Sequence, residues 1–233
     1  MADIKINLPR LKGKIIALDG PAGSGKSTTA KMLAARLGYV YLDTGAMYRA
    51  LTYFALKSKI APSDGDKLAA IAERVPIEFE THEDINRVFI NGEDVTEQIR
   101  TPEVTQHVSE VSAHKDVRAA MVAKQREMGK KGSIVAEGRD TTTVVFTNAD
   151  VKIYLAASVK ERARRRLLDL TKMGISTTLE EQEADINRRD GHDSNRKHSP
   201  LKKAPGAIAV DTTDMTIEGQ VDYIISLIRQ VLK

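Results

Sequence analysis

The sequence predicts an α/β fold in which about five short strands form a parallel sheet with helices on both faces. Two observations predict this fold class. Short apolar runs alternate along the chain with longer segments of helical periodicity. The first run is apolar at nearly every position, which is typical of a parallel strand buried on both faces. That run then breaks into glycines and continues as a helix-forming sequence.

The glycine-rich turn follows the first predicted strand, Lys14–Asp19. Its spacing, Gly20, four residues, then Gly25-Lys26-Ser27, is that of a phosphate-binding loop, G-x-x-x-x-G-K-[ST]. Glycines let backbone N–H groups turn onto phosphate oxygens, and the following helix directs its positive end at them. We expect Lys26 to reach the β and γ phosphates and the Ser27 hydroxyl to bind Mg²⁺, which prefers oxygen. A plain glycine turn with a solvated lysine is the alternative.

The triphosphate of ATP is therefore expected to contact the residues of this loop: Gly20, Pro21, Ala22, Gly23, Ser24, Gly25, Lys26, Ser27 and Thr28.

The next elements complete one strand–helix–strand unit. A helix begins near Gly25, places apolar residues on one stripe and stops at Gly38. Tyr39–Leu42 is a second strand. A second helix opens at Asp43-Thr44-Gly45 and runs to about Lys57.

Residues 58–128 follow a different pattern, which we interpret as an inserted lobe. Ile77–Glu80 and Arg87–Ile90 are strand-like, and Asn91-Gly92 predicts a hairpin turn into Glu93–Val95. Helical sequence extends from about Pro102 through Met128, with a break expected near His114.

The pattern of buried strands returns with Ser133–Glu137, Val151–Leu155 and Ala207–Asp211. Three further helices are predicted. Capping boxes open two of them, at Ser158 with Glu161 and at Thr178 with Glu181, and they extend toward Lys172 and Asp190. The third, Ile217–Leu232, is amphipathic and closes the chain. The polar, basic stretch Gly191–Pro205 is expected to be a mobile loop or lid.

Composition limits the class of protein. The 233 residues, 41% of them hydrophobic, suit one α/β domain with insertions. The absence of cysteine excludes disulfides and thiolate metal sites. Met1–Leu11 is too short and mixed for the apolar part of a signal peptide, so we expect a cytoplasmic protein without a membrane partner. The net charge of +4 favours anionic ligands, and nucleotides satisfy this as well as nucleic acid does. We expect a monomer.

Arginines are expected around the phosphate-binding loop, because phosphoryl transfer between two anions needs cations that neutralise phosphate charge. In parallel sheets ligands lie beyond the carboxyl ends of the strands. The candidates at this edge are Arg49, Arg139, Arg189 and Arg196. Arg162, Arg165 and Arg166 share one helical face, and either phosphate contact or an ordinary solvated face would explain that spacing. The five histidines show no metal-binding spacing of the HExxH kind.

Six segments follow one another in a specific order and spacing: Asp19–Ser27, Leu42–Arg49, Ile99–Thr101, Glu137–Asp140, Thr143–Phe146 and Val151–Leu155. Together they resemble the bacterial cytidylate kinases, from about Lys14 to the C-terminus. The resemblance implies a P-loop nucleoside triphosphate hydrolase-like three-layer sandwich, with a five-stranded parallel sheet, an inserted monophosphate-binding lobe and a lid. It also implies the reaction of ATP with CMP or dCMP to give ADP and CDP or dCDP, with Mg²⁺.

The resemblance assigns roles by motif position. It places the acceptor phosphate on Thr44, Arg49, Arg139 and Arg196, and the sugar near Tyr48, Arg189 and Asp193. A reader of cytosine needs hydrogen-bond acceptors for the N4 amino group and a donor for the ring edge. By resemblance, these are Asp140 and Ser109 as acceptors and Arg118 as donor. From their shared helical face we expect Arg162 and Arg166 to contact ATP, and we expect Lys26, Arg139 and Arg196 to be the catalytic residues.

One domain is expected over residues 1–233, with a core of about 13–57, 129–187 and 206–233, the insert 58–128, and a lid of about 188–205. Closure of lid and lobe is expected to align the acceptor with the γ-phosphoryl group and to exclude water. No general base is assigned, because a phosphate acceptor already carries an anionic nucleophilic oxygen.

Two segments depart from the family pattern. Thr141-Thr142 stand where the family usually has an apolar residue and glycine, and the extra Cβ at Thr142 is expected to affect the loop backbone near Asp140. The lid carries Gly191-His192 and Ser194 where more charge is usual.

Three alternatives remain at this point. The first is a kinase of another small acceptor such as UMP, AMP or shikimate, against which the set Ser109, Arg118 and Asp140 argues. The second is a GTP-dependent switch protein, although no Asn-Lys-x-Asp segment is present. The third treats Arg188–Lys203 as a nucleic-acid-binding arm, although Asp190 and Asp193 interrupt its positive charge.

Overall fold

A computed structural model of the chain describes residues 12–82 and 85–233, and the side chains of all of these except 81–85. The segment Met1–Leu11, for which no signal peptide was predicted, lies outside the described residues. The chain divides into two compact units, the first formed by Met1–Tyr41 with Lys131–Lys233 and the second by Leu42–Lys130. None of the described helices is both long and apolar enough to span a bilayer.

The main sheet has five strands in the order β2-β6-β1-β7-β8. Their bounds are β1 Ile15–Asp19, β2 Val40–Asp43, β6 Ile134–Gly138, β7 Val151–Ala156 and β8 Ile208–Asp211. The central strand β1 pairs in parallel with β6 and β7, and β7 pairs in parallel with β8. Because Asp19 lies opposite Gly138, the loops that follow β1 and β6 start side by side. The predicted α/β fold class, with a five-stranded parallel sheet, is confirmed.

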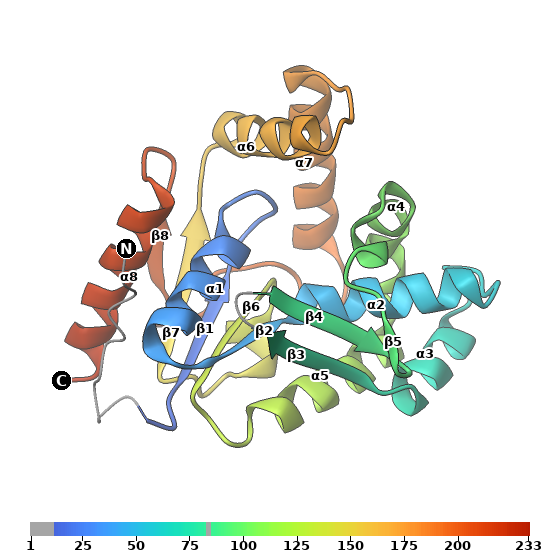
Figure 1. The fold of residues 1–233 in the computed structure, drawn as a ribbon, viewed down its shortest axis with the longest axis horizontal. Helices are drawn as coiled ribbons and strands as arrows, with labels where there is room; N and C mark the ends of the chain where they lie inside the picture. Colours follow the sequence, from blue (N-terminus) through green and yellow to red (C-terminus); the bar gives the residue numbers. More distant parts are fainter. Residues whose placement is uncertain (1–11, 83–84) are drawn as a thin grey trace. The chain divides into compact units, whose positions relative to one another are not determined.

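Helices α1 (Lys26–Leu37) and α8 (Ile217–Val231) pack on this sheet. Their apolar stripes join the strand side chains in one buried cluster, as the periodicity predicted. Leu33 of α1 and Ile224 of α8 are fully buried in it, together with Leu18 of β1. Helices α6 (Val159–Lys172) and α7 (Leu179–Asn195) pack against each other beyond the carboxyl ends of β1 and β7 (Figure 1).

The second unit contains helices and a small antiparallel sheet (Figure 1). Its elements are α2 Thr44–Lys57, α3 Gly65–Arg74, β3 Ile77–His82, β4 Ile85–Ile90, β5 Glu93–Asp94, the 3₁₀ turn η2 Gln98–Arg100, α4 Pro102–Val111 and α5 Lys115–Gly129. The predicted hairpin turn is confirmed: Asn91 and Gly92 both have positive φ, 51° and 78°, as a type I′ turn requires. The predicted helix break is also confirmed, because His114 precedes α5 as its N-cap.

Three local predictions were wrong or incomplete. Helix α7 continues through Gly191 to Asn195, so the first part of the stretch predicted as a loop is helical. The sequence did not predict helix α3, because Pro62, Gly65 and Pro76 indicate turns in this segment. The capping box at Thr178 is complete, but at Ser158 only half of it forms. The carboxylate of Glu161 there accepts hydrogen bonds from Arg164 and Arg165 instead.

A further feature that the sequence did not predict is a short π-helical turn, η3, over Thr141–Val145. It starts three residues after β6 and contains both threonines that depart from the family pattern. Thr142 is not among the described residues with positive φ, so a side chain fits this backbone without strain.

Candidate nucleotide-binding and active site

The phosphate-binding loop leaves the end of β1 and enters α1, as the motif predicted. Gly20, Gly23 and Gly25 have φ of 153°, 75° and 88°. A Cβ on Gly20 would lie 2.1 Å from the carbonyl oxygen of Leu155 in β7, so no other residue fits there. The loop therefore packs directly against the neighbouring strand, and its first glycine is required by close approach as well as by conformation.

Lys26 is buried under this loop, with 5% of its surface exposed. Its Nζ donates hydrogen bonds to the carbonyl oxygen of Pro21 at 2.7 Å and to Oγ of Ser24 at 3.4 Å. Burial, and then the positive charge of Arg139, lower the pKa of Lys26 to about 7, while the carboxylates of Glu137, Asp19 and Asp193 oppose the shift. Two cations thus lie close together in a poorly solvated place, an arrangement that a bound polyanion would stabilise.

Ser27 at the start of α1 lies against the buried carboxylate of Glu137 on β6. Its Oγ donates a hydrogen bond of 2.6 Å to Oε1 of Glu137, which also accepts one of 3.2 Å from the Tyr41 hydroxyl. Glu137 lies in one of the segments that resemble the family, but it is not among the predicted site residues. The sequence does contain a signal for Glu137: a carboxylate near the carboxyl end of β6, the strand that pairs with β1, is expected close to the ligand.

Arg139, Asp193 and Arg196 form a cluster. Nε of Arg139, just after β6, donates a hydrogen bond of 2.9 Å to Oδ2 of Asp193 on α7. Nη1 of Arg196 lies 3.8 Å from the other carboxylate oxygen, and its Nε donates to the carbonyl oxygen of Ser199. The charges of Arg139, Arg196 and Arg189 lower the pKa of Asp193, although burial opposes them. Three predicted residues are therefore brought together, and the charge of a fourth, Arg189, also acts on Asp193.

Asp140 is buried at the start of η3, with 4% of its surface exposed. Its carbonyl oxygen accepts hydrogen bonds from the N–H groups of Val144 and Val145. The same turn contacts the phosphate-binding strand: the N–H groups of Thr141 and Thr142 donate to the carboxylate of Asp19. The segment that carries Asp140 is thereby fixed to the start of the phosphate-binding loop.

The three arginines of α6 differ from one another. Arg162 is buried and donates to the carbonyl oxygen of Ala22 in the phosphate-binding loop at 3.1 Å, and it forms an ion pair of 2.7 Å with Asp190 on α7. Arg165 donates to Glu161 and to Thr212. Arg166 is half-buried on the same helix. Arg162 and Arg165 both bind other groups of the protein, so the alternative of an ordinary solvated face is wrong for these two residues.

The remaining predicted residues belong to the second unit. Thr44, Tyr48 and Arg49 lie on α2, Ser109 on α4 and Arg118 on α5. The guanidinium of Arg118 stacks over the Tyr48 ring at 5.2 Å and donates to the carbonyl oxygen of Ser112, so α2 and α5 bring these two together. Arg49 forms an ion pair of 2.8 Å with Asp43, the N-cap of α2.

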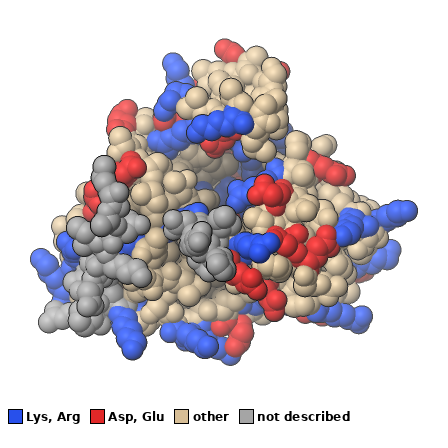
Figure 2. All heavy atoms as spheres, in the orientation of Figure 1, with Lys and Arg blue, Asp and Glu red and all other residues tan. Residues whose placement is uncertain are grey.

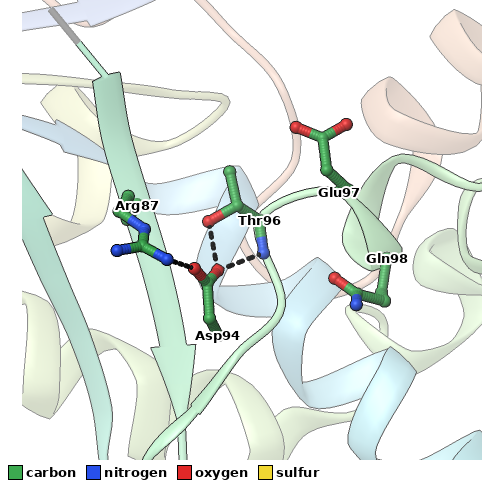
Figure 3. A pocket seen from close by; sticks show the side chains of 5 residues that line it. All are labelled: Arg87, Asp94, Thr96, Glu97 and Gln98. Carbon is green, nitrogen blue, oxygen red and sulfur yellow. Dashed lines mark hydrogen bonds and ion pairs between the residues drawn. The ribbon is translucent and has the colours of Figure 1, made fainter.

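A hollow of about 320 Å³ lies elsewhere in the second unit (Figure 3). It is lined by Arg87, Asp94, Thr96, Glu97 and Gln98. Arg87 and Thr96 both turn toward Asp94 and bind its carboxylate, so the charges of Arg87 and Asp94 neutralise each other (Figure 3). It contains none of the predicted site residues.

The residues of the first unit form an arrangement suited to a triphosphate and a second phosphate. Backbone N–H groups and Lys26 lie at the end of β1, a hydroxyl–carboxylate pair lies at Ser27 and Glu137, and arginines lie after β6 and on α6 and α7. Such a site neutralises and positions phosphates, which is most of what phosphoryl transfer requires of a protein.

Comparison with known proteins identifies the fold and the family of this chain. A solved structure of an uncharacterized protein from Eubacterium ventriosum matches with a TM-score of 0.51 and 13% identity over 94% of this chain and 99% of that one, which shows a shared fold. A cytidylate kinase of Bacillus cytotoxicus is 48% identical over 94% of this chain and 97% of its own length. A cytidylate kinase of a Geobacillus species is 50% identical over 92% of this chain and 96% of its own length. The family description "Cytidylate kinase" matches residues 16–230, and the chain therefore belongs to the cytidylate kinase family.

Proposed function

We propose that this kinase transfers the γ-phosphoryl group of ATP to CMP or dCMP, giving ADP and CDP or dCDP, through the residues described above. Family membership supports the reaction. The observation that supports the site is the proximity of two cations, the buried Lys26 at the start of α1 and the half-buried Arg139 just after β6, whose charge helps to lower the pKa of Lys26. Such repulsion is relieved when phosphate charge binds, so the site is prepared for a polyanion.

In this proposal the loop Gly20–Thr28 binds the phosphates of ATP through its backbone N–H groups. Lys26 exchanges its internal hydrogen bonds for the β and γ phosphates. Arg162, already bound to the carbonyl oxygen of Ala22, supports the loop from α6, and Arg166 contributes further positive charge.

Mg²⁺ is the expected companion of ATP, and the side chains present suit it. Ser27 and Glu137 offer a hydroxyl and a carboxylate oxygen 2.6 Å apart, and Mg²⁺ is usually bound in such sites by one or two protein oxygens together with phosphates and water. When bound, the ion would supply neutralisation of the developing phosphate charge.

The acceptor phosphate is assigned to Arg139 and Arg196 of the first unit and to Thr44 and Arg49 of the second. Asp193 holds Arg139 in place and, with Arg189 and Tyr48, is assigned to the sugar. These groups position the acceptor and neutralise its charge, and its own anionic oxygen is the nucleophile.

The base is assigned to Asp140, Ser109 and Arg118. Carboxylate and hydroxyl oxygens accept from the N4 amino group of cytosine, whereas uracil presents an acceptor at that position. The division into core, insert (58–128) and lid (188–205), with closure around the substrates, is part of the same proposal.

The test is ADP release from ATP and Mg²⁺ with CMP, dCMP, UMP, AMP or GMP supplied separately at equal concentrations. We expect strong turnover with CMP and dCMP and little with the others. A preference for UMP or AMP would contradict the base assignment, and no stimulation by any monophosphate would contradict the acceptor assignment.

Figure 2 shows Lys and Arg interspersed with Asp and Glu on the visible face, which does not favour the nucleic-acid alternative there.

A further inference from the structure

Asp19, the last residue of β1, has a carboxylate that is completely buried. Both of its oxygens accept hydrogen bonds from η3: Oδ1 from the Thr141 N–H at 2.8 Å, and Oδ2 from the Thr142 N–H at 2.7 Å. A buried carboxylate must be hydrogen-bonded to remain stable, and the first N–H groups of a helical turn need acceptors. Asp19 and η3 therefore satisfy each other.

The Thr142 hydroxyl adds a third hydrogen bond, of 2.5 Å, to Oδ2 of Asp19. A glycine at this position, which the family pattern leads one to expect, would supply the N–H alone. Thr142 has 2% of its surface exposed, so this hydrogen bond lies away from bulk water. The hydrogen bond from the Thr142 hydroxyl to Asp19 therefore depends on a residue that departs from the family pattern.

The contact joins two parts of the proposed site. Asp19 directly precedes the phosphate-binding loop, and Asp140, assigned to the base, directly precedes η3. The carbonyl oxygen of Asp140 also accepts from Val144 and Val145 inside the turn, so a shift of η3 moves Asp140 with it.

We propose that Thr142 is a positioning residue: its hydroxyl, bound to Asp19, fixes the turn that carries Asp140 against the phosphate-binding loop and so sharpens the choice of CMP. The proposal rests on the proposed function, because it needs Asp140 to read the base. Thr142 itself does not touch a substrate.

The matched control lies in the same turn. The hydroxyl of Thr143 is buried and has no hydrogen-bond partner among the described residues. Thr143→Val and Thr142→Val therefore remove the same group from neighbouring positions, and only the second removes a bond to Asp19. Thr142→Ser keeps the hydroxyl, and Thr142→Gly restores the usual family residue while losing the hydroxyl.

The experiment measures kcat/KM for CMP and for UMP in the full chain, with ATP and Mg²⁺ saturating, below the melting temperature of every variant. We expect Thr142→Val and Thr142→Gly to lose about tenfold in kcat/KM for CMP, which corresponds to about 1.4 kcal/mol, and less for UMP. The ratio of CMP to UMP should fall. Thr142→Ser and Thr143→Val should stay within about twofold of the unsubstituted protein.

Two outcomes would overturn the proposal. In one, both hydroxyl-free variants keep the CMP to UMP ratio, whether or not their stability falls. In the other, Thr143→Val lowers the ratio as much as Thr142→Val does. If Thr142→Val does not fold, Thr142→Gly decides between the same outcomes. Failure of the proposed function is distinguishable from failure of this proposal, because the unsubstituted protein itself would then show no activity with CMP.

Discussion

The hydroxyl of Ser27 and the carboxylate of Glu137 are joined by a hydrogen bond of 2.6 Å, although 110 residues separate them in sequence. The link crosses from the first turn of α1 to β6, beside the predicted phosphate-binding loop. Glu137 is buried and Ser27 is exposed, so the pair presents one side to solvent. Two oxygens at this place are what a magnesium–nucleotide complex would use.

Glu137→Gln tests this relationship. The amide preserves size but loses the charge, so we expect the Mg²⁺ concentration for half-maximal activity to rise about tenfold and kcat to fall about 10- to 100-fold. A magnesium titration of ADP release measures both. Glu218→Gln, at an exposed position on α8, is the control and should change neither. An unchanged magnesium requirement in Glu137→Gln would contradict the role.

Arg162 and Arg166 offer a matched comparison on α6. Arg162→Ala removes the hydrogen bond to Ala22 and the ion pair with Asp190. The other carboxylate oxygen of Asp190, Oδ1, is already buried without a hydrogen-bond partner among the described residues. We expect KM for ATP to rise about tenfold or more, because hydrogen bonds to charged groups are worth about 1.5 to 3 kcal/mol. Arg166→Ala loses the same charge but should change KM less than about threefold. If the two substitutions raise KM for ATP equally, the positive charge of α6 and not the hydrogen bond to Ala22 determines ATP binding.

Much of this site could be predicted from the sequence where the signal is local. The phosphate-binding loop needs its glycines at fixed spacing, and Asn91-Gly92 fixes a turn by backbone conformation alone. Strand order then brings the ends of β1 and β6 together, as rules for parallel sheets imply. The family resemblance extended this to individual residues, and its site assignments remain predictions.

What could not be predicted depends on contacts between distant segments. Helix α7 passes through Gly191, which is a poor helix former, and the helical residue Asp193 beyond it binds Arg139 and accepts from Leu201 through its carbonyl oxygen. The turn η3 needs Asp19 on another strand to accept its N–H groups. Helical spacing placed Arg162 and Arg166 on one face but could not distinguish their partners.

Asp140→Ala tests the choice of base. If Asp140 accepts from the N4 amino group, its loss should lower kcat/KM for CMP by about 10- to 100-fold, equivalent to about 1 to 3 kcal/mol. The effect on UMP should be smaller, so the CMP to UMP ratio falls. Parallel assays with both monophosphates measure the ratio, with Asp169→Ala on the exposed side of α6 as the control. A ratio that stays constant while both rates fall would refute base recognition by Asp140.

Glu161 provides a test that involves stability and pH rather than catalysis. Hydrogen bonds from Arg164, and then Arg165, lower the pKa of Glu161 to about 2, while partial burial opposes them. Its carboxylate accepts at 2.8 Å from both arginines. Since the folded pKa lies below the unfolded value of 4.5, the stabilisation is complete above about pH 4.5 and is lost as the pH falls toward about 2.

Glu161→Gln should therefore lower the free energy of unfolding by about 1 kcal/mol at pH 7, because the pairs are partly exposed and screened by solvent. Urea denaturation between pH 7 and pH 3 should show the difference from the unsubstituted protein shrinking below about pH 4.5. Asp185→Asn removes a more exposed pair, with Arg188 on α7, and should cost less than about 0.5 kcal/mol. A difference that persists undiminished at pH 3 would mean that Glu161 acts through packing and not through its charge.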